Sequence, residues 1–528
     1  MASLLSLLTV RVCIALLALT HAVVAQGDFA TQCSSFINQV DIENVTVYTT
    51  QYVGAGSTVN LSGGDSSCGQ SSQVASANLC RITMEVATSP NSRISLEAWF
   101  PQNYTDRFLS TGNGGIGGCI QYTDMDYTSS LGFATVGANN GHNGTGGAAF
   151  LNHPDVIIDF AWRSLHTGVV IGKQLTELFY GAPHTASYYL GCSTGGRQGW
   201  KMAQDFPDDF DGVVAGAPAI AWNSLQYWSG NFYTVTGASG SPTFVSTSQW
   251  QTVHQEVLNQ CDALDGATDS ILENPDLCDF DVTPLICSGG STANCLTATQ
   301  AETVRTLLSP LYDENGELIY PRMQPGAEVL ASYVMWNGQP FAFSTDWFRY
   351  AVLNDSSWNP ATLDLADYAT VMAQNPGGIE TFNGDISAFA SAGGKMLHYH
   401  GLADGLISSD NSKRYYALVQ ETMGMEPAEL DDFYRFFGIS GMGHCSGGDG
   451  AANIGNGAGA AGTSPDENVL MSMVRWVEEG VAPEVVRGAK SDMYSGQVSY
   501  WRAHCKWPLT NTYVGPGAVE DESAWECT

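Results

Sequence analysis

Two short motifs, far apart in the chain, each place a cysteine beside a residue suited to nucleophilic catalysis. The first is Gly191-Cys192-Ser193-Thr194-Gly195, which fits the G-x-S-x-G nucleophile elbow, a sharp strand-to-helix turn that exposes a serine hydroxyl. The second is Gly441-Met442-Gly443-His444-Cys445, in which a histidine precedes the cysteine. If the two cysteines are bonded, their Cα atoms lie about 5.5–6 Å apart. The serine and the histidine then come close to the hydrogen-bonding reach that base-activated attack requires, which favours acyl transfer.

The residues around the serine fit the elbow better than an ordinary turn. Glycine is abundant, with 58 in the chain, so a chance match to G-x-S-x-G would be no surprise. However, Ser187–Leu190 is an apolar run typical of a short buried strand, and Arg197–Gln204 can begin a helix. A strand, a serine and a helix in this order are the context that the motif needs.

The N-terminus predicts a secreted protein. Arg11 precedes an apolar run over Val12–Leu19, and Val23-Val24-Ala25 supplies small residues for cleavage, so residues 1–25 are expected to be a signal peptide. The apolar run is too short to span a bilayer, and no membrane anchor is expected. Without the signal peptide, 19 basic and 53 acidic residues give a formal charge of −34 (19 − 53). This charge disfavours binding to nucleic acid or to anionic membranes, and an acidic extracellular protein explains it without a cationic partner.

The cysteine count agrees with an oxidising compartment. Cys13 leaves with the signal peptide, and the remaining twelve of the 13 cysteines predict six disulfides. Three local pairs are expected: Cys261–Cys278, Cys287–Cys295 and Cys505–Cys527. Four N-terminal cysteines remain to pair in an order that the sequence leaves open: Cys33, Cys68, Cys80 and Cys119. Five sequons fit the same secretory route and predict N-glycosylation at Asn44, Asn60, Asn103, Asn143 and Asn354.

Strand-like and helical runs alternate in two separate parts of the chain. Expected strands lie at 94–100, 107–110, 133–138, 187–190, 212–215, 396–399 and 433–437. Expected helices lie at 160–180, 411–420 and 468–479. Such alternation predicts an α/β fold with a mostly parallel sheet covered by helices.

An aromatic-rich stretch with four cysteines separates the two alternating parts. We therefore expect an α/β domain in two parts, 26–221 and 386–528, split by an inserted domain at 222–385. Because the insertion follows the nucleophile strand and precedes the other candidate catalytic residues, it is expected to cover the active site as a lid. The glycine- and alanine-rich stretch 447–462 is expected to be a long surface loop.

A serine nucleophile needs a base, and the base needs a carboxylate to orient it. Asp404 follows the expected strand at 396–399, and His444 follows the one at 433–437. The carboxyl ends of parallel strands meet at one edge of a sheet, and serine, acid, histidine is the chain order of α/β hydrolases. Ser193, Asp404 and His444 are the predicted nucleophile, acid and base. The alternative for Asp404 is a turn aspartate, since Asp-Gly is a common turn pair.

Backbone N–H groups are predicted to stabilise the oxyanion of acyl transfer. One belongs to Thr194, directly after the nucleophile. The second is assigned to Gly115 in the glycine-rich loop 111–118, with Gly114 as the alternative. This loop and the stretch 457–462 both match G-x-G-x-x-G, but neither precedes a convincing helix with a ribose-binding acid, which excludes a dinucleotide site.

Two further clusters have metal-binding residue types. The stretch Asp262–Ile271 gathers three carboxylates around a glycine turn, and such oxygen ligands suit Ca²⁺. Its spacing is not that of an EF-hand, and an acidic surface loop is the alternative. His398 and His400 alternate on an expected strand, where a core position explains them as well as zinc would.

The residues of the two opening motifs resemble the fungal tannase and feruloyl esterase family. The mark of that family is a Cys-Ser, Asp, His-Cys signature whose two cysteines are bonded, and it is matched here by Cys192-Ser193, Asp404 and His444-Cys445. The resemblance covers nearly the whole chain after residue 25 and implies an α/β-hydrolase fold with a large inserted lid. It also implies a structural Ca²⁺ in the lid, held by three carboxylates and two main-chain carbonyls: Asp262, Asp265, Asp269, Ala267 and Ile271.

Family members cleave hydroxycinnamate esters such as ferulate from plant cell-wall sugars, or gallate esters from tannins. The similarity is greater to the type B feruloyl esterases. It implies a secreted serine carboxylesterase acting on feruloyl esters of polysaccharides such as arabinoxylan and pectin, or on small phenolic esters. Tannase activity on galloyl esters is the near alternative. A serine peptidase and an inactive glycan-binding glycoprotein are the alternatives from other classes.

Overall fold

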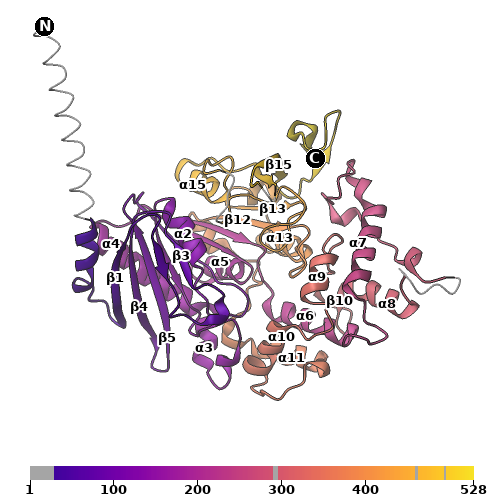
Figure 1. Cartoon of the computed structure of the whole chain (residues 1–528), viewed down its shortest axis with the longest axis horizontal. Coiled ribbons are helices and arrows are strands. Elements are labelled where there is room, and N and C mark those ends of the chain that lie inside the picture. The colour runs from indigo at the N-terminus through magenta and orange to yellow at the C-terminus, as the bar shows by residue number, and fades with distance from the viewer. Residues whose placement is uncertain (1–28, 289–294, 458–461, 493–494) are drawn as a thin grey trace, which may run out of the picture.

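A nine-stranded sheet forms the centre of the protein (Figure 1). The computed structural model describes residues 29–288, 295–457, 462–492 and 495–528. The strands lie in the order β1 (Val45–Val53), β4 (Leu79–Ser89), β5 (Ser92–Pro101), β7 (Phe133–Ala138), β6 (Arg107–Thr111), β8 (Ala186–Cys192), β9 (Gly212–Gly216), β12 (Lys395–Gly401) and β13 (Tyr434–Ile439). The pairs from β1 to β7 are antiparallel, and every pair from β7 to β13 is parallel. The predicted α/β-hydrolase fold is confirmed.

Helices cover both faces of this sheet, and each face has its own hydrophobic core. One core includes side chains of α4 (Ser164–Tyr180), α5 (Thr194–Asp205) and α13 (Ser409–Met423), and the other those of α2 (Tyr122–Ser130) and α15 (Val469–Glu479). Strand β8, which ends directly before Ser193, belongs to both cores, since Tyr188 packs into one and Tyr189 into the other. A central parallel strand is covered on both faces, and all of β8 up to Gly191 is buried.

All the strands and helices expected from the sequence in the two alternating parts are present within a few residues of the expected bounds. Before α4, however, Asp159–Arg163 forms a π-helical turn. Two strands of the sheet, β1 and β4, were not expected. The prediction of a surface loop at 447–462 is wrong for part of its length, because Ala451, Ala452 and Ile454 are buried; residues 458–461 lie outside the described residues.

Between β9 and β12 the chain forms a mainly helical region with a third hydrophobic core. Figure 1 shows its helices gathered beside the sheet. They include α6 (Trp222–Thr236), α7 (Thr247–Cys261), α8 (Ala298–Leu307), α9 (Glu328–Val334), α10 (Ala342–Asp346), α11 (Leu365–Gln374) and α12 (Ser387–Ser391). Its core contains Trp228, Trp250 and Trp336, but also Phe160 and Ile407 from the flanking parts of the chain. The region is therefore packed firmly against the sheet domain, and the exact bounds 222–385 stay a prediction.

Six disulfides join the twelve cysteines that follow the predicted signal peptide. They are Cys33–Cys80, Cys68–Cys119, Cys192–Cys445, Cys261–Cys278, Cys287–Cys295 and Cys505–Cys527. The three expected local pairs are among them, and the N-terminal pairing that the sequence left open is now defined. The signal-peptide prediction, residues 1–25, falls outside the described residues.

Two features bear on the predicted secretory route. All five sequon asparagines are exposed, which is the condition for N-glycosylation: Asn44, Asn60, Asn103, Asn143 and Asn354. In the described part of the chain, no helix combines the length and the apolar character needed to cross a membrane.

Candidate active site

Ser193 occupies the sharp turn between β8 and α5. Its backbone has φ 65° and ψ −122°, a region that non-glycine residues rarely adopt. Hydrogen bonds hold the turn: the Ser193 N–H donates to the Gly216 carbonyl at 3.0 Å, and the Ser193 carbonyl accepts from the N–H groups of Arg197 and Ala219, each at 3.0 Å. Strain of this kind costs about 1–3 kcal/mol and persists where surrounding structure enforces it, typically at active sites.

Asp404 and His444 lie in the loops after β12 and β13, at the same edge of the sheet as the elbow. His444 Nδ1 is 2.7 Å from Asp404 Oδ2. Because a carboxylate can only accept, Nδ1 carries the proton, and Nε2 of the neutral ring is left as the basic nitrogen. Asp404 is fully buried, and its Oδ1 accepts the N–H groups of Leu406 at 2.8 Å and Ile407 at 3.1 Å.

These contacts keep the Asp404 carboxyl ionised. Burial alone would raise its pKa, but the charge and hydrogen bond of His444 and the hydrogen bond of His400 outweigh burial. The pKa of Asp404 therefore lies well below its ordinary value. Its main-chain carbonyl is also held, since Gln324 Nε2, from the region between β9 and β12, donates to it at 2.6 Å.

His400 is a neighbour of Asp404 that the sequence analysis did not identify. Its Nε2 lies 3.2 Å from Asp404 Oδ2 and 3.1 Å from the Ile407 carbonyl, so this nitrogen is protonated and donates. Its Nδ1 is 2.6 Å from Ser412 Oγ, which lies 2.8 Å from Nε2 of His398. These side chains are all buried and hydrogen-bonded to one another, which explains the paired histidines of β12 without zinc.

The Cys192–Cys445 disulfide joins the residue before Ser193 to the residue after His444. Its Cα atoms lie 6.0 Å apart across 253 residues of chain. Ser193 and His444 both line one cavity at this edge of the sheet. The structure thus brings together all three residues of the predicted triad.

The cavity has a wide lobe and a narrow lobe. The wide lobe encloses about 650 Å³ and is lined by polar groups that include Gln121, Asp124 and Asn453. The narrow lobe has about 30 Å³ of free space and is lined by side chains from the region between β9 and β12: Trp222, Leu225, Gln226, Phe341 and Phe343. Residues common to both lobes, at their junction, are Gly115, Ser193, Phe343, Leu406 and His444.

Of the two predicted oxyanion donors, Gly115 lies at this junction and Thr194 lines the narrow lobe. Thr194 is the first residue of α5, and its side-chain hydroxyl donates to the Gly115 carbonyl at 2.5 Å, which fixes the Gly115 peptide beside the elbow. Gly115 has φ +59°, and a Cβ there would lie 2.7 Å from the Phe343 ring, so no larger residue fits. The alternative donor, Gly114, lines only the wide lobe.

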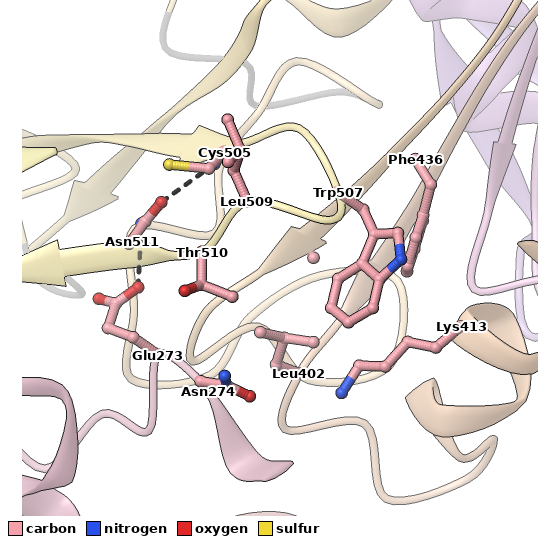
Figure 2. Close-up of a pocket in the computed structure, with 11 residues that line it drawn as sticks. Glu273, Asn274, Leu402, Lys413, Phe436, Cys505, Trp507, Leu509, Thr510 and Asn511 are labelled. Carbon is pink, nitrogen blue, oxygen red and sulfur yellow. Dashed lines mark hydrogen bonds between the residues drawn. The ribbon is translucent and has the colours of Figure 1, made fainter. Parts of the chain in front are cut away.

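A second cavity, lying under the C-terminal strands, contains none of these residues (Figure 2). It encloses about 20 Å³, enough for about one water molecule. Its polar groups have partners within the protein: Asn511 donates to Glu273 at 2.9 Å and accepts from the Cys505 N–H at 3.0 Å (Figure 2), and Glu273 is paired with Arg502. We therefore place no functional site there.

The predicted calcium ligands lie in a tight loop after α7. Asp262 and Asp265 are buried, and Asp262 Oδ1 has no hydrogen-bond partner, as expected of a cation ligand without its ion. Asp265 accepts the N–H groups of Ala267 at 3.1 Å and Glu273 at 3.0 Å. Among the described residues, no three His, Cys, Asp or Glu side chains are grouped closely enough to hold a metal. A cation here would therefore depend on main-chain carbonyls, and the site stays a prediction.

Comparison with known proteins identifies the family of this chain. The sequence profile described as tannase and feruloyl esterase matches residues 80–528. This chain belongs to the tannase and feruloyl esterase family. The family resemblance inferred from the two cysteine motifs is confirmed.

Proteins named as feruloyl esterases match nearly the whole chain. A probable feruloyl esterase B-2 of Aspergillus terreus is 58% identical over 509 residues, which cover 96% of this chain and 97% of the relative. Feruloyl esterase C of Talaromyces stipitatus is 55% identical over 506 residues, 95% of this chain and 96% of its own. The crystal structure of feruloyl esterase B from Aspergillus oryzae superposes with a TM-score of 0.93 at 51% identity, covering 95% of this chain and 100% of that one.

Proposed function

We propose that this member of the tannase and feruloyl esterase family is a secreted serine esterase that hydrolyses feruloyl and related hydroxycinnamoyl esters of plant cell-wall polysaccharides. The observation that carries the proposal is the strained turn at Ser193, whose preceding cysteine is bonded to the cysteine after His444. The His444 ring lies 2.7 Å from the buried carboxylate of Asp404. The identity of 58% to a protein named probable feruloyl esterase B-2 supports the choice of acyl group.

In the proposed reaction, Ser193 Oγ attacks the ester carbonyl carbon while His444 Nε2 takes its proton and Asp404 stabilises the imidazolium. The N–H groups of Thr194 and Gly115 bind the oxyanion. The ester C–O bond then breaks, and the sugar alcohol leaves with the proton from His444. Water, deprotonated by His444, attacks the acyl-enzyme and releases the free acid and Ser193.

The two lobes of the cavity suit the two halves of such an ester. An aromatic acyl group matches the apolar side chains of the narrow lobe, and a sugar matches the polar groups of the wide lobe. The region 222–385 acts as a lid, since it supplies five of the twelve residues that line the narrow lobe and Gln324 from it holds the Asp404 loop.

Calcium and glycans are proposed to stabilise the fold rather than to act in the reaction. Asp262, Asp265 and Asp269, with the carbonyls of Ala267 and Ile271, would hold one Ca²⁺, which would neutralise carboxylates that otherwise repel each other in a buried loop. N-glycans are proposed at the five exposed sequons.

A panel of esters tests the proposal. The parent enzyme is expected to hydrolyse methyl ferulate faster than methyl gallate, and Ser193→Ala is expected to abolish both activities while the circular dichroism spectrum stays unchanged. Faster cleavage of methyl gallate would make the chain a tannase. Unchanged turnover by the Ser193→Ala variant would refute the assigned nucleophile, and failure of an organophosphonate to label Ser193 would favour an inactive glycan-binding protein.

A further inference from the structure

The narrow lobe of the catalytic cavity contains a buried oxygen atom that no group of the protein satisfies. Gln226 is 3% exposed and lines this lobe together with Ser193. Its Oε1 has no hydrogen-bond partner. Leaving a buried acceptor unpaired is costly, so native proteins keep few such groups, and each calls for a physical reason.

A second unsatisfied group lies on the same face of the same helix. Trp222 and Gln226 are four residues apart on α6, Leu225 lies between them on that face, and all three residues line the lobe. Trp222 is 1% exposed, and its indole Nε1–H also lacks a partner. The helix begins three residues after Ala219, whose N–H donates to the Ser193 carbonyl at 3.0 Å. This hydrogen bond therefore fixes the position of this face of α6 relative to Ser193.

The donor and acceptor left open in this lobe specify the chemistry of a ligand. Apart from His444, the residues that line the lobe have no ionisable side chain, so a charged acyl group would be bound without a counter-charge. A purely apolar ring would fill the space but leave Gln226 Oε1 unpaired. A hydroxyl on an aromatic ring would fill the space and donate its proton to Gln226 Oε1.

We propose that Gln226 selects substrates whose aromatic acyl group carries a phenolic hydroxyl, by accepting the hydrogen bond of that hydroxyl in the narrow lobe. This inference rests on the proposed esterase function and adds a specificity-determining residue to it.

The test compares three methyl esters that differ only at one ring position: methyl 4-hydroxycinnamate, methyl cinnamate and methyl 4-methoxycinnamate. The measured quantity is the ratio of kcat/KM for the hydroxylated ester to that for each of the others. Because a buried polar group built to pair with a substrate hydroxyl discriminates against analogues that lack it, the parent enzyme is expected to give ratios of about 10 to 100. Gln226→Leu, which removes the acceptor at similar volume, is expected to bring both ratios to about 1 by the same argument.

Two control variants separate hydrogen bonding from packing. Leu225→Ala enlarges the same lobe without touching a polar atom, and it is expected to lower all three kcat/KM values while preserving the ratios. Asn411→Leu removes another buried amide oxygen without a partner, but Asn411 lines neither lobe, so the ratios are expected to stay at the parent values.

The outcomes distinguish the inference from the function on which it rests. A parent enzyme that hydrolyses none of the three esters would refute the proposed function. A parent enzyme that hydrolyses all three with ratios near 1 would overturn the role of Gln226 and leave the esterase assignment intact, and this measurement does not depend on the folding of any variant. Parent ratios that persist in Gln226→Leu would likewise overturn it.

Discussion

Removal of the disulfide between Cys192 and Cys445 should affect the stability of this protein and its catalytic rate to different extents. Replacing both cysteines by alanine frees a loop whose ends are 253 residues apart. The chain-entropy relation gives a loss of about 5 kcal/mol in the free energy of unfolding, an upper value because the relation counts only the unfolded chain. With about 2.1 cal/mol/K of unfolding entropy per residue, a chain of about 500 residues should lose about 5 °C in Tm.

Removal of this disulfide should also lower kcat, even at temperatures where the variant is fully folded. The bond flanks Ser193 on one side and His444 on the other, so its removal loosens the position of the base relative to the nucleophile. A misplacement of about 1 Å in such a pair can cost about 100-fold in rate, and we expect a fall of this order in kcat. The assay is hydrolysis of methyl ferulate at a temperature where both proteins are folded.

A matched variant at Cys505 and Cys527 provides the control. This disulfide spans 22 residues and joins two strands that do not line the catalytic cavity. The same relation gives a loss of about 3 kcal/mol on its removal, and kcat should stay at the parent value. Equal falls in kcat for the two variants, or full activity without the Cys192–Cys445 bond, would refute the positional role of the bond.

Three further predictions concern groups around the cavity and the lid. His400→Leu removes a hydrogen bond that helps hold the pKa of Asp404 down. We therefore expect kcat to fall about 10-fold and the acid limb of the kcat pH profile to move to higher pH. An acid limb at the same pH as in the parent would contradict a positioning role for His400. Burial raises the pKa of Asp124 to about 6 from the ordinary 3.8, so the folded state binds this proton more tightly and stability falls as pH rises between these values. Asp124→Asn should therefore have a higher Tm than the parent at pH 7 and a smaller difference at pH 4, and a difference independent of pH would argue against the shift. A chelator should lower the Tm of the parent and added Ca²⁺ should restore it. The Tm of Asp262→Asn should change with neither addition. A parent Tm that does not change with the chelator would exclude the calcium site.

The grouping of the candidate catalytic residues was predictable because their positions follow from local pattern and sheet topology. Ser193 lies in a motif that defines its own strand-to-helix turn, and Asp404 and His444 follow parallel strands, whose ends share an edge. The buried runs of β8 and β9 were similarly clear, since both faces of these strands are covered.

Other features depend on contacts that no sequence pattern encodes. Strand β1 lies at the edge of the sheet and only its last residue, Val53, is fully buried, so the sequence carries no run of buried residues to mark it. The contact between His400 and Asp404 arises from the bend of the chain after β12, and a histidine on a buried strand gives no sign of it. Glutamine is common on the exposed surface of helices, and only the packing of α6 against the cavity shows that the amide oxygen of Gln226 is buried. The stretch after Gly447 has the glycine content of a loop, while its burial reflects tertiary packing alone.

The Cys192–Cys445 bond also has a consequence for biosynthesis. When Cys192 emerges from the ribosome, 253 residues must still be made before its partner exists, including every helix between β9 and β12. The link can therefore form only after both halves of the sheet have been made and an oxidant has acted. A newly made copy that is still in a reducing environment contains the side chains of the predicted triad but not the covalent link between the two loops that hold Ser193 and His444.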